Sequence, residues 1–443
     1  MSQLESKHFL YPTKTKSWLY SLLYPWVAKG VDLFVDKLYI NGLNQVPTDG
    51  PVMLIANHQN AMLDPLICCR AFPRQLHWLT RSDVFKNKLV ANILHQINML
   101  PIYREKDGVA DQMQRNEEVF KVCRERLSKG AAVAMFPEGS HRGKKQLMTP
   151  LKKGFARLAF TSVEKDSRLM SLKIIPMGID YSHFLEYQPR LILKIGVPIA
   201  IKDYWDQYLE DPNKAINQLV KAANDHLSSL MVDIRDEENY QVLIDLEPLF
   251  WNQESVHLDY EFTKYKKWTD QWVNFDEESK GLYRSYHVLL QEMQLSSLQV
   301  ERFFHITWKQ KCMYYIEWLP SFLGIVLYSP LYFLAENFIK KNIKDELFYN
   351  SIRLAIYTFL SPFYLLFLSG IAIFSFQNLS GLELAIGWFF SISLGLFVIS
   401  WSKNKRKVRD NRRAAVISKK DPEKWEKLLN VRNEILTHGK EFL

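Results

Sequence analysis

The sequence predicts an α/β fold in which a mostly parallel central sheet is flanked by helices, with further helices that associate with a membrane. Between residues 50 and 200, short apolar runs alternate with segments of helical periodicity. This is the pattern of successive strand–helix units around a parallel sheet. Beyond residue 353, two stretches without a charged residue are each long enough to cross a hydrocarbon core of about 30 Å.

The composition indicates a folded protein with an anionic partner. A hydrophobic fraction of 47% excludes an intrinsically disordered chain. The formal net charge of +9 over 443 residues fits a membrane phospholipid, a nucleic acid or a phosphorylated substrate. The cysteines form no CxxC pair, so neither a disulfide framework nor a zinc site is expected; they are Cys68, Cys69, Cys123 and Cys312. The start of the chain lacks a secretory cleavage site, so we expect the soluble part to stay in the cytoplasm.

Residues 1–45 are expected to form an N-terminal helical segment at the membrane interface. Within residues 17–40, apolar and aromatic side chains recur at helical spacing, but Lys29, Asp32 and Lys37 interrupt them. Such a segment is too charged to cross a bilayer, and its Trp and Tyr side chains suit the headgroup region. The alternative is a core helix of the soluble domain.

Residues 46–235 are expected to form the α/β domain. Its apolar runs predict strands over residues 52–56, 131–136, 172–179 and 190–196. The segment 116–128 has helical periodicity and stops at Gly130, which is typical of a helix that ends in a glycine cap before a buried strand. Residues 236–310, rich in charge and aromatic side chains, are expected to form a helical extension.

Residues 311–402 are expected to form the membrane region. Two transmembrane helices are predicted over residues 354–376 and 384–401, whereas 319–335 is shorter, contains two prolines and is expected to be re-entrant or interfacial. The connector 377–381 lacks Lys and Arg, whereas the start of the basic tail 403–443 has seven such residues between 403 and 413. The positive-inside rule therefore predicts a hairpin with both ends in the cytoplasm.

The stretch NHQNAMLDP places His58 and Asp64 directly after a predicted buried strand. Asp followed by Pro is a common helix start, with Asp as the N-cap and Pro at the first helical position. Asp211-Pro212 and Asp421-Pro422 also precede helix-like segments without a nearby histidine. Asp64 is therefore either a cap or the partner of His58, and its position at the carboxyl end of a strand favours a site.

The stretch FPEGSHRG follows another predicted strand. Pro137 ends the strand and Gly139 permits a tight turn. A loop that presents backbone N–H groups, a hydroxyl group and a cation is a reasonable phosphate cradle, although a plain strand-to-helix turn is an equal alternative. Arg104 in LPIYR suits bidentate phosphate recognition, and Pro176 in IIPMGI is expected to interrupt a strand that borders the site.

Taken in order, these four stretches resemble the blocks of the glycerolipid acyltransferase superfamily, which includes the glycerol-3-phosphate and lysophosphatidic acid acyltransferases. The blocks are NHQNAMLD, LPIYR, FPEGS and IIPMGI. Five residues separate His58 from Asp64 where the commonest family pattern has four, as in the branch with eukaryotic-type glycerol-3-phosphate acyltransferases. His141 stands where the family usually has Arg, and Arg142 follows it.

The resemblance implies an O-acyltransferase of phospholipid synthesis. His58 would be the general base and Asp64 would orient it, while the phosphorylated acceptor would be held by Arg104, Glu138, Gly139, Ser140 and Arg142. It implies no metal or other cofactor, with acyl-CoA or acyl carrier protein as co-substrate. The acceptor would be glycerol 3-phosphate or 1-acylglycerol 3-phosphate.

Further expectations concern the cellular setting, and two alternative functions stay open. We expect an integral membrane protein with a phospholipid membrane as partner, no nucleic acid, and an active site that faces the cytoplasm. One alternative is a phospholipid-remodelling transacylase that uses the same His and Asp. The other is a non-catalytic lipid-binding membrane protein with a degenerate acyltransferase domain.

Overall fold

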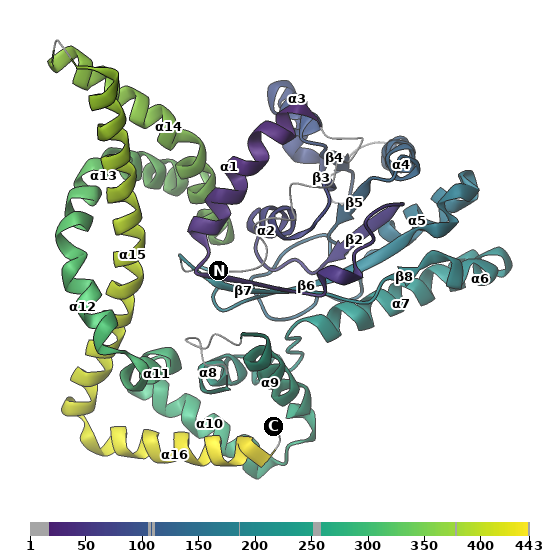
Figure 1. Cartoon of the computed structure of the whole chain (residues 1–443). Helices are drawn as coiled ribbons and strands as arrows, with labels where there is room; N and C mark the ends of the chain where they lie inside the picture. Colours follow the sequence, from purple (N-terminus) through teal and green to yellow (C-terminus); the bar gives the residue numbers. More distant parts are fainter. Residues whose placement is uncertain are drawn as a thin grey trace. The chain divides into compact units, whose positions relative to one another are not determined.

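Figure 1 shows the computed structural model of the chain, which describes residues 17–104, 108, 111–185, 187–250, 258–376 and 379–441. The chain divides into two compact units, Met1–Asp233 and Ile234–Leu443. The first unit contains the sheet and the second is helical, and each is described by itself.

The first unit is built on an eight-stranded sheet with the order β1-β7-β6-β2-β5-β3-β4, and β8 pairs with β6. Only β7 and β8 run antiparallel to β6, and the other neighbours are parallel. The predicted α/β class with a mostly parallel sheet is confirmed. The strands are β1 Lys37–Asn41, β2 Val52–Ala56, β3 Leu76–Arg81, β4 Leu100–Ile102, β5 Ala132–Met135, β6 Lys173–Tyr181, β7 Arg190–Ile195 and β8 Ile199–Ala200.

Helices flank this sheet (Figure 1). Every residue of β2 is buried, as a central strand covered on both faces requires. The predicted helix before Gly130 is α4, which begins four residues earlier than expected, and Gly130 has a φ of 74° in the left-handed region. The helices of the first unit are α1 Trp18–Phe34, α2 Leu63–Ala71, α3 Lys88–Gln96, α4 Gln112–Ser128, α5 Gly154–Lys165, α6 Trp205–Glu210 and α7 Pro212–Leu230.

The N-terminal segment differs from the expectation in its second half. Trp18 and Leu22 are exposed on α1, as an interfacial helix would have them, but Val31 and Phe34 are buried. The residues from Lys37 form β1, which pairs in parallel with β7, so the sheet begins before the predicted boundary at residue 46. Asp36 anchors this entry through a buried ion pair with Arg190, 3.1 Å.

The expected interruption of a strand at Pro176 is also wrong. β6 runs continuously through Pro176, which lies opposite Ile55 of β2. Proline removes one N–H donor from the ladder but not its carbonyl, and the Pro176 carbonyl accepts a hydrogen bond from the Gly196 N–H, 2.9 Å. β6 therefore continues past Pro176 and lies beside the residues that follow β2.

Among its described residues, the second unit has helices joined by short loops and no strand. Within the predicted helical extension 236–310, α10 and α11 are separate helices, with Gln294 between them at a φ of 52°. The predicted tail from residue 403 is helical as well. The helices are α8 Tyr240–Phe250, α9 Leu258–Gln271, α10 Glu277–Glu292, α11 Ser297–His305, α12 Trp308–Ile316, α13 Trp318–Asn342, α14 Tyr349–Ser375, α15 Gly381–Lys420 and α16 Pro422–Glu441.

Three of these helices are long and apolar enough to cross a membrane by length and composition: α13, the segment Glu346–Ser375 that contains α14, and α15. The expected short re-entrant element is thus part of α13, a continuous helix of 25 residues with Pro330 inside it. Proline is tolerated in apolar helices because neighbouring helices and side chains satisfy the freed backbone groups.

The segments before and after these apolar helices pack on each other. Arg302 of α11 pairs with Asp410, which lies beyond the apolar part of α15. Arg432 of α16 forms two hydrogen bonds to Glu301 of α11, at 2.6 and 2.8 Å. These contacts place α11 beside residue 410 of α15 and beside α16.

Candidate active site

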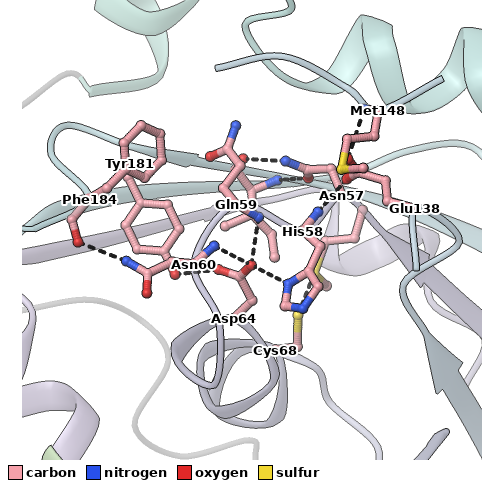
Figure 2. Close-up of polar contacts among 12 residues, drawn as sticks. Asn57, His58, Gln59, Asn60, Asp64, Cys68, Glu138, Met148, Tyr181 and Phe184 are labelled. Atoms are coloured by element: carbon pink, nitrogen blue, oxygen red, sulfur yellow. Dashed lines mark hydrogen bonds and ion pairs between the residues drawn. The ribbon is translucent and has the colours of Figure 1, made fainter. Parts of the chain in front are cut away.

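The candidate site begins where β2 ends. Asn57 directly follows this strand, and its side chain takes part in the polar contacts drawn in Figure 2. The Asn57 side-chain amide donates to the Ile179 carbonyl, 2.9 Å, and accepts from the Ile179 N–H, 2.7 Å. The asparagine thus extends the sheet by side-chain hydrogen bonds after the strand has turned away, and it fixes where the next residue, His58, leaves the sheet.

His58 and Asp64 are in direct contact. The His58 Nδ1 lies 2.8 Å from Asp64 Oδ2, and the histidine side chain is 15% exposed whereas the aspartate is fully buried. With Asp64 as the acceptor, the proton of the neutral imidazole sits on Nδ1 and Nε2 has a free lone pair. This is the arrangement of a general base held by a carboxylate.

Further donors surround the Asp64 carboxylate (Figure 2). The backbone N–H groups of Gln59 and Asn60 each donate to Oδ2 at 2.8 Å. The Tyr181 hydroxyl donates to Oδ1 at 2.6 Å, and burial, together with the charge of Asp64, raises the pKa of Tyr181 well above its usual value. Tyr181 therefore stays a donor, and both oxygens of Asp64 are fixed from different elements.

Asp64 does not cap α2. The N-cap position is Met62, which makes no side-chain capping bond, and Asp64 lies in the first turn of the helix. Its carboxylate points to the loop that precedes the helix. The interpretation of Asp64 as the N-cap is therefore wrong, because α2 begins at Leu63, one residue before the aspartate.

An aromatic stack supports the imidazole of His58. The ring of Phe136, the first residue of the FPEGS block, lies 4.0 Å from the His58 ring at an interplanar angle of 8°. Trp78 of β3 stacks on Phe136 at 4.8 Å, and His141 lies 5.2 Å from the His58 ring. Such packing limits rotation of the imidazole about its side-chain bonds, so the ring plane is set before any substrate binds.

Glu138 joins the loop after β2 to the loop after β5 rather than facing outward. It is buried, and the His58 N–H donates to its Oε1 while the Met148 N–H donates to its Oε2 at 2.8 Å. Burial raises the pKa of Glu138 to about 8, although these two hydrogen bonds oppose the shift. Both oxygens are engaged by the backbone, so the geometry gives Glu138 a positioning role; its predicted contact with an acceptor stays a prediction.

The loop after β5 is held in place by further contacts. The Gly143 N–H donates to the Gln59 carbonyl, 2.9 Å. The buried Lys145 pairs with Asp180 of β6 and donates to the Tyr181 carbonyl, 2.7 Å. A buried ion pair costs much desolvation and serves mainly to specify one arrangement. Here that arrangement is the position of this loop against the end of β6.

The other predicted acceptor-binding residues lie at the same edge of the sheet. Gly139 has a φ of 72°, and Ser140 beside it is half-buried. Arg142 is exposed, with Gln146 within 3.5 Å. Arg104 follows β4, which β5 and β3 separate from β2. The structure thus brings His58 together with Asp64 and Glu138, and it places Arg104 at the same carboxyl edge some strands away.

Two contributors were missed from the sequence, Tyr181 and Trp78. Tyr181 is 117 residues from Asp64 along the chain, so no local spacing pairs them.

Among the residues that the structure describes, no group of three or more His, Cys, Asp and Glu side chains could hold a metal ion. The chemistry that the described site can supply is proton transfer at the His58 imidazole, positioned by a buried carboxylate.

Comparison with known proteins gives one family. The family model described as acyltransferase matches residues 37–180. An uncharacterized acyltransferase of Schizosaccharomyces pombe is 26% identical over 255 residues, which are 53% of this chain and 37% of that protein. Glycerol-3-phosphate O-acyltransferase 2 of Saccharomyces cerevisiae is 28% identical over 129 residues, 29% of this chain and 17% of that protein.

Bacterial proteins are also similar. A 1-acyl-sn-glycerol-3-phosphate acyltransferase of Bacillus subtilis is 22% identical over 192 residues, 42% of this chain and 87% of that protein. The crystal structure of the 1-acyl-sn-glycerophosphate acyltransferase of Thermotoga maritima has 19% sequence identity and a TM-score of 0.34, and the match covers 50% of this chain and 86% of that one. The chain spans well under half the length of the two yeast relatives.

Proposed function

We propose, because residues 37–180 match the acyltransferase family model, that the protein moves a fatty acyl chain from a thioester donor to a hydroxyl group of a glycerophosphate. The acceptor we propose is glycerol 3-phosphate or 1-acylglycerol 3-phosphate, the compounds in the names of its relatives. The observation that carries the proposal is the His58–Asp64 contact at the carboxyl end of β2.

The proposed reaction needs no covalent enzyme intermediate, because the thioester is already activated. As the acceptor oxygen attacks the thioester carbonyl carbon, its proton passes to His58 Nε2. The carbon–sulfur bond then breaks, the sulfur leaves as a thiolate, and the imidazolium returns the proton to give a thiol and an ester. Asp64 stabilises the imidazolium between these two transfers. Acyl-CoA or acyl carrier protein would be the donor, without a metal or other cofactor.

We further propose that the enzyme is an integral membrane protein whose active site faces the cytoplasm. Three apolar helices support the membrane association. The ion pair between Arg302 of α11 and Asp410 of α15 supports an even number of crossings between these two residues, so that α14 and the apolar part of α15 would cross and α13 would not. Basic residues after the apolar part of α15 favour the cytoplasmic side, where soluble thioester donors are found.

The test uses the full chain purified into phospholipid vesicles. Labelled acyl-CoA or acyl carrier protein is supplied with a panel of acceptors, and the product lipid is identified by mass spectrometry. We expect a product from glycerol 3-phosphate or 1-acylglycerol 3-phosphate that disappears with His58→Ala. A protein that is folded, yet forms no ester with any acceptor of the panel, would contradict the proposal and favour a lipid-binding role.

A further inference from the structure

The short helix α3 exposes a stripe of large apolar side chains on the acyltransferase domain. Leu89 is 72% exposed, Ile93 44% and Val90 40%, and no residue of α3 is buried. Successive residues of a helix are about 100° apart, so these three side chains lie within one sector of its circumference. A helix whose apolar stripe faces away from the core marks an interaction surface.

The helix is well defined by its own sequence. The Asn87 side chain caps it by accepting hydrogen bonds from the Leu89 and Val90 N–H groups, at 2.9 and 3.3 Å. At its other end the His95 ring lies against Phe85, 5.0 Å between centroids. The polar and aromatic contacts thus hold α3 to its own surroundings, and the apolar stripe is not needed for them.

The charge around α3 selects the kind of partner. Between Arg81 and Arg104 the chain has four Lys and Arg residues and one carboxylate, Asp83. That carboxylate already pairs with Arg81, so the segment carries excess positive charge. An apolar stripe in a cationic segment fits the surface of an anionic phospholipid bilayer.

The segment 81–104 ends at Arg104, which is predicted to bind the phosphorylated acceptor. The hydrogen bond from Arg81 lowers the pKa of Asp83, and the charge of Arg104 lowers it further. Arg104 therefore lies close enough to the turn before α3 to interact with it. A bilayer in contact with α3 would bring lipid phosphates to the edge of the sheet where Arg104 lies.

We propose that α3 docks the acyltransferase domain onto an anionic phospholipid bilayer, with Leu89, Val90 and Ile93 inserted at the boundary between headgroups and acyl chains. The covalent link to the apolar helices of the second unit keeps the domain at high local concentration near the bilayer, so a small stripe suffices. This deepens the proposed function, because a lipid acceptor would then reach the site from the membrane. Only the statement that the acceptor arrives from the membrane rests on the proposed function, and the docking of α3 does not.

The test measures the depth of single labels in the full chain. Cys312 is exposed and is replaced by Ser. The other native thiols can remain, since burial raises the pKa of Cys69 to about 11, that of Cys123 to about 12 and that of Cys68 well above its usual value. An environment-sensitive fluorophore is then placed by Leu89→Cys, in vesicles of phosphatidylcholine with phosphatidylglycerol and nitroxide-labelled lipids. The matched control is Met113→Cys, an apolar residue of α4 that is 84% exposed.

We expect the lipid-borne nitroxide to quench the label at Leu89 several-fold more than the label at Met113. A label at Lys88, on the opposite side of α3, should resemble the control. Equal quenching at Leu89 and Met113 would overturn the proposal, and so would a shielded but unquenched label at Leu89, which would indicate a second copy of the chain. These readouts need no enzymatic activity, so they remain decisive if the proposed function fails.

A kinetic arm connects the surface to the substrate. The double variant Leu89→Asp with Ile93→Asp should raise the KM for a long-chain 1-acylglycerol 3-phosphate about tenfold. The KM for a water-soluble acceptor and the kcat should stay as in the parent protein. An equal loss with both acceptors would mean that α3 serves the fold or the chemistry, and would contradict membrane docking.

Discussion

The first unit contains two Asp–Pro dipeptides near the start of a helix, and their aspartates have different roles. Asp211 is the N-cap of α7, and its side chain accepts a hydrogen bond from the Lys214 N–H, 3.0 Å, with Pro212 at the start of the helix. Asp64 lies inside the first turn of α2, and its carboxylate accepts from the preceding loop and from Tyr181. A third dipeptide repeats the capping role, since Asp421 accepts from the Lys424 N–H.

The comparison shows that the role of the aspartate depends on its surroundings in the fold and cannot be read from the Asp–Pro dipeptide alone. Asp211 is exposed and finds its donor within its own helix. Asp64 is fully buried beyond the end of a central strand, where His58 and two backbone N–H groups converge on one oxygen. A buried carboxylate needs such partners, because burial without them is costly. Here the partners include His58, the base that the proposed reaction requires.

The largest expected effect tests the partner of Asp64. His58→Ala should lower the rate of acyl transfer by about 10² to 10⁴-fold, the usual contribution of a general base. Thermal unfolding should change little, because the buried Asp64 carboxylate keeps its hydrogen bonds from the Gln59 and Asn60 N–H groups and from the Tyr181 hydroxyl. His226→Ala on α7 is the matched control and should keep full activity. A His58→Ala enzyme with more than about a tenth of the parent rate would not fit a general-base role.

A smaller effect is expected at the second support of Asp64. Tyr181→Phe removes one hydrogen bond to a charged group, which is worth about 1.5 to 3 kcal/mol. If about half of that free energy is lost in the transition state, the rate should fall about four- to thirteenfold. The KM values should change less than kcat, whereas a merely structural role would lower the amount of folded enzyme without changing kcat per folded molecule. Circular dichroism and single-turnover rates separate the two.

The smallest effect is expected at the capping dipeptide. Asp211→Ala should reduce the free energy of unfolding by about 1 kcal/mol, the usual value of an N-cap. Its acyl transfer rate per folded molecule should be that of the parent, because Asp211 caps α7 and has no part in the proposed chemistry. A rate loss comparable to that of Tyr181→Phe would show that the two dipeptides are less distinct than the geometry indicates.

Much of the fold was predictable because its strands are buried on both faces. The run 52–56 is wholly apolar and forms β2 at those bounds. The position of His58 just beyond the end of this strand predicts a functional site. The length of α13 was missed because Pro330 counts against a helix in water but not beside apolar neighbours. Tyr181 was missed because only the pairing of β2 with β6 brings it near Asp64, and that register is not readable from either segment alone.

The central claim, that Asp64 serves the histidine and not the helix, is tested most directly by the same substitution at both dipeptides. Asparagine caps a helix about as well as aspartate, so Asp211→Asn should change neither thermal unfolding nor acyl transfer. Asparagine at position 64 can still accept from the loop with its amide oxygen and donate to the Tyr181 hydroxyl, but it lacks the charge that stabilises an imidazolium.

We predict that Asp64→Asn unfolds within a few degrees of the parent protein and loses at least about a hundredfold in rate, a loss of the size that general-base catalysis contributes. The measurement is the rate of ester formation per folded molecule, with Asp211→Asn assayed beside it. An Asp64→Asn protein that is both stable and fully active would contradict the account, because the carboxylate would then have no chemical role.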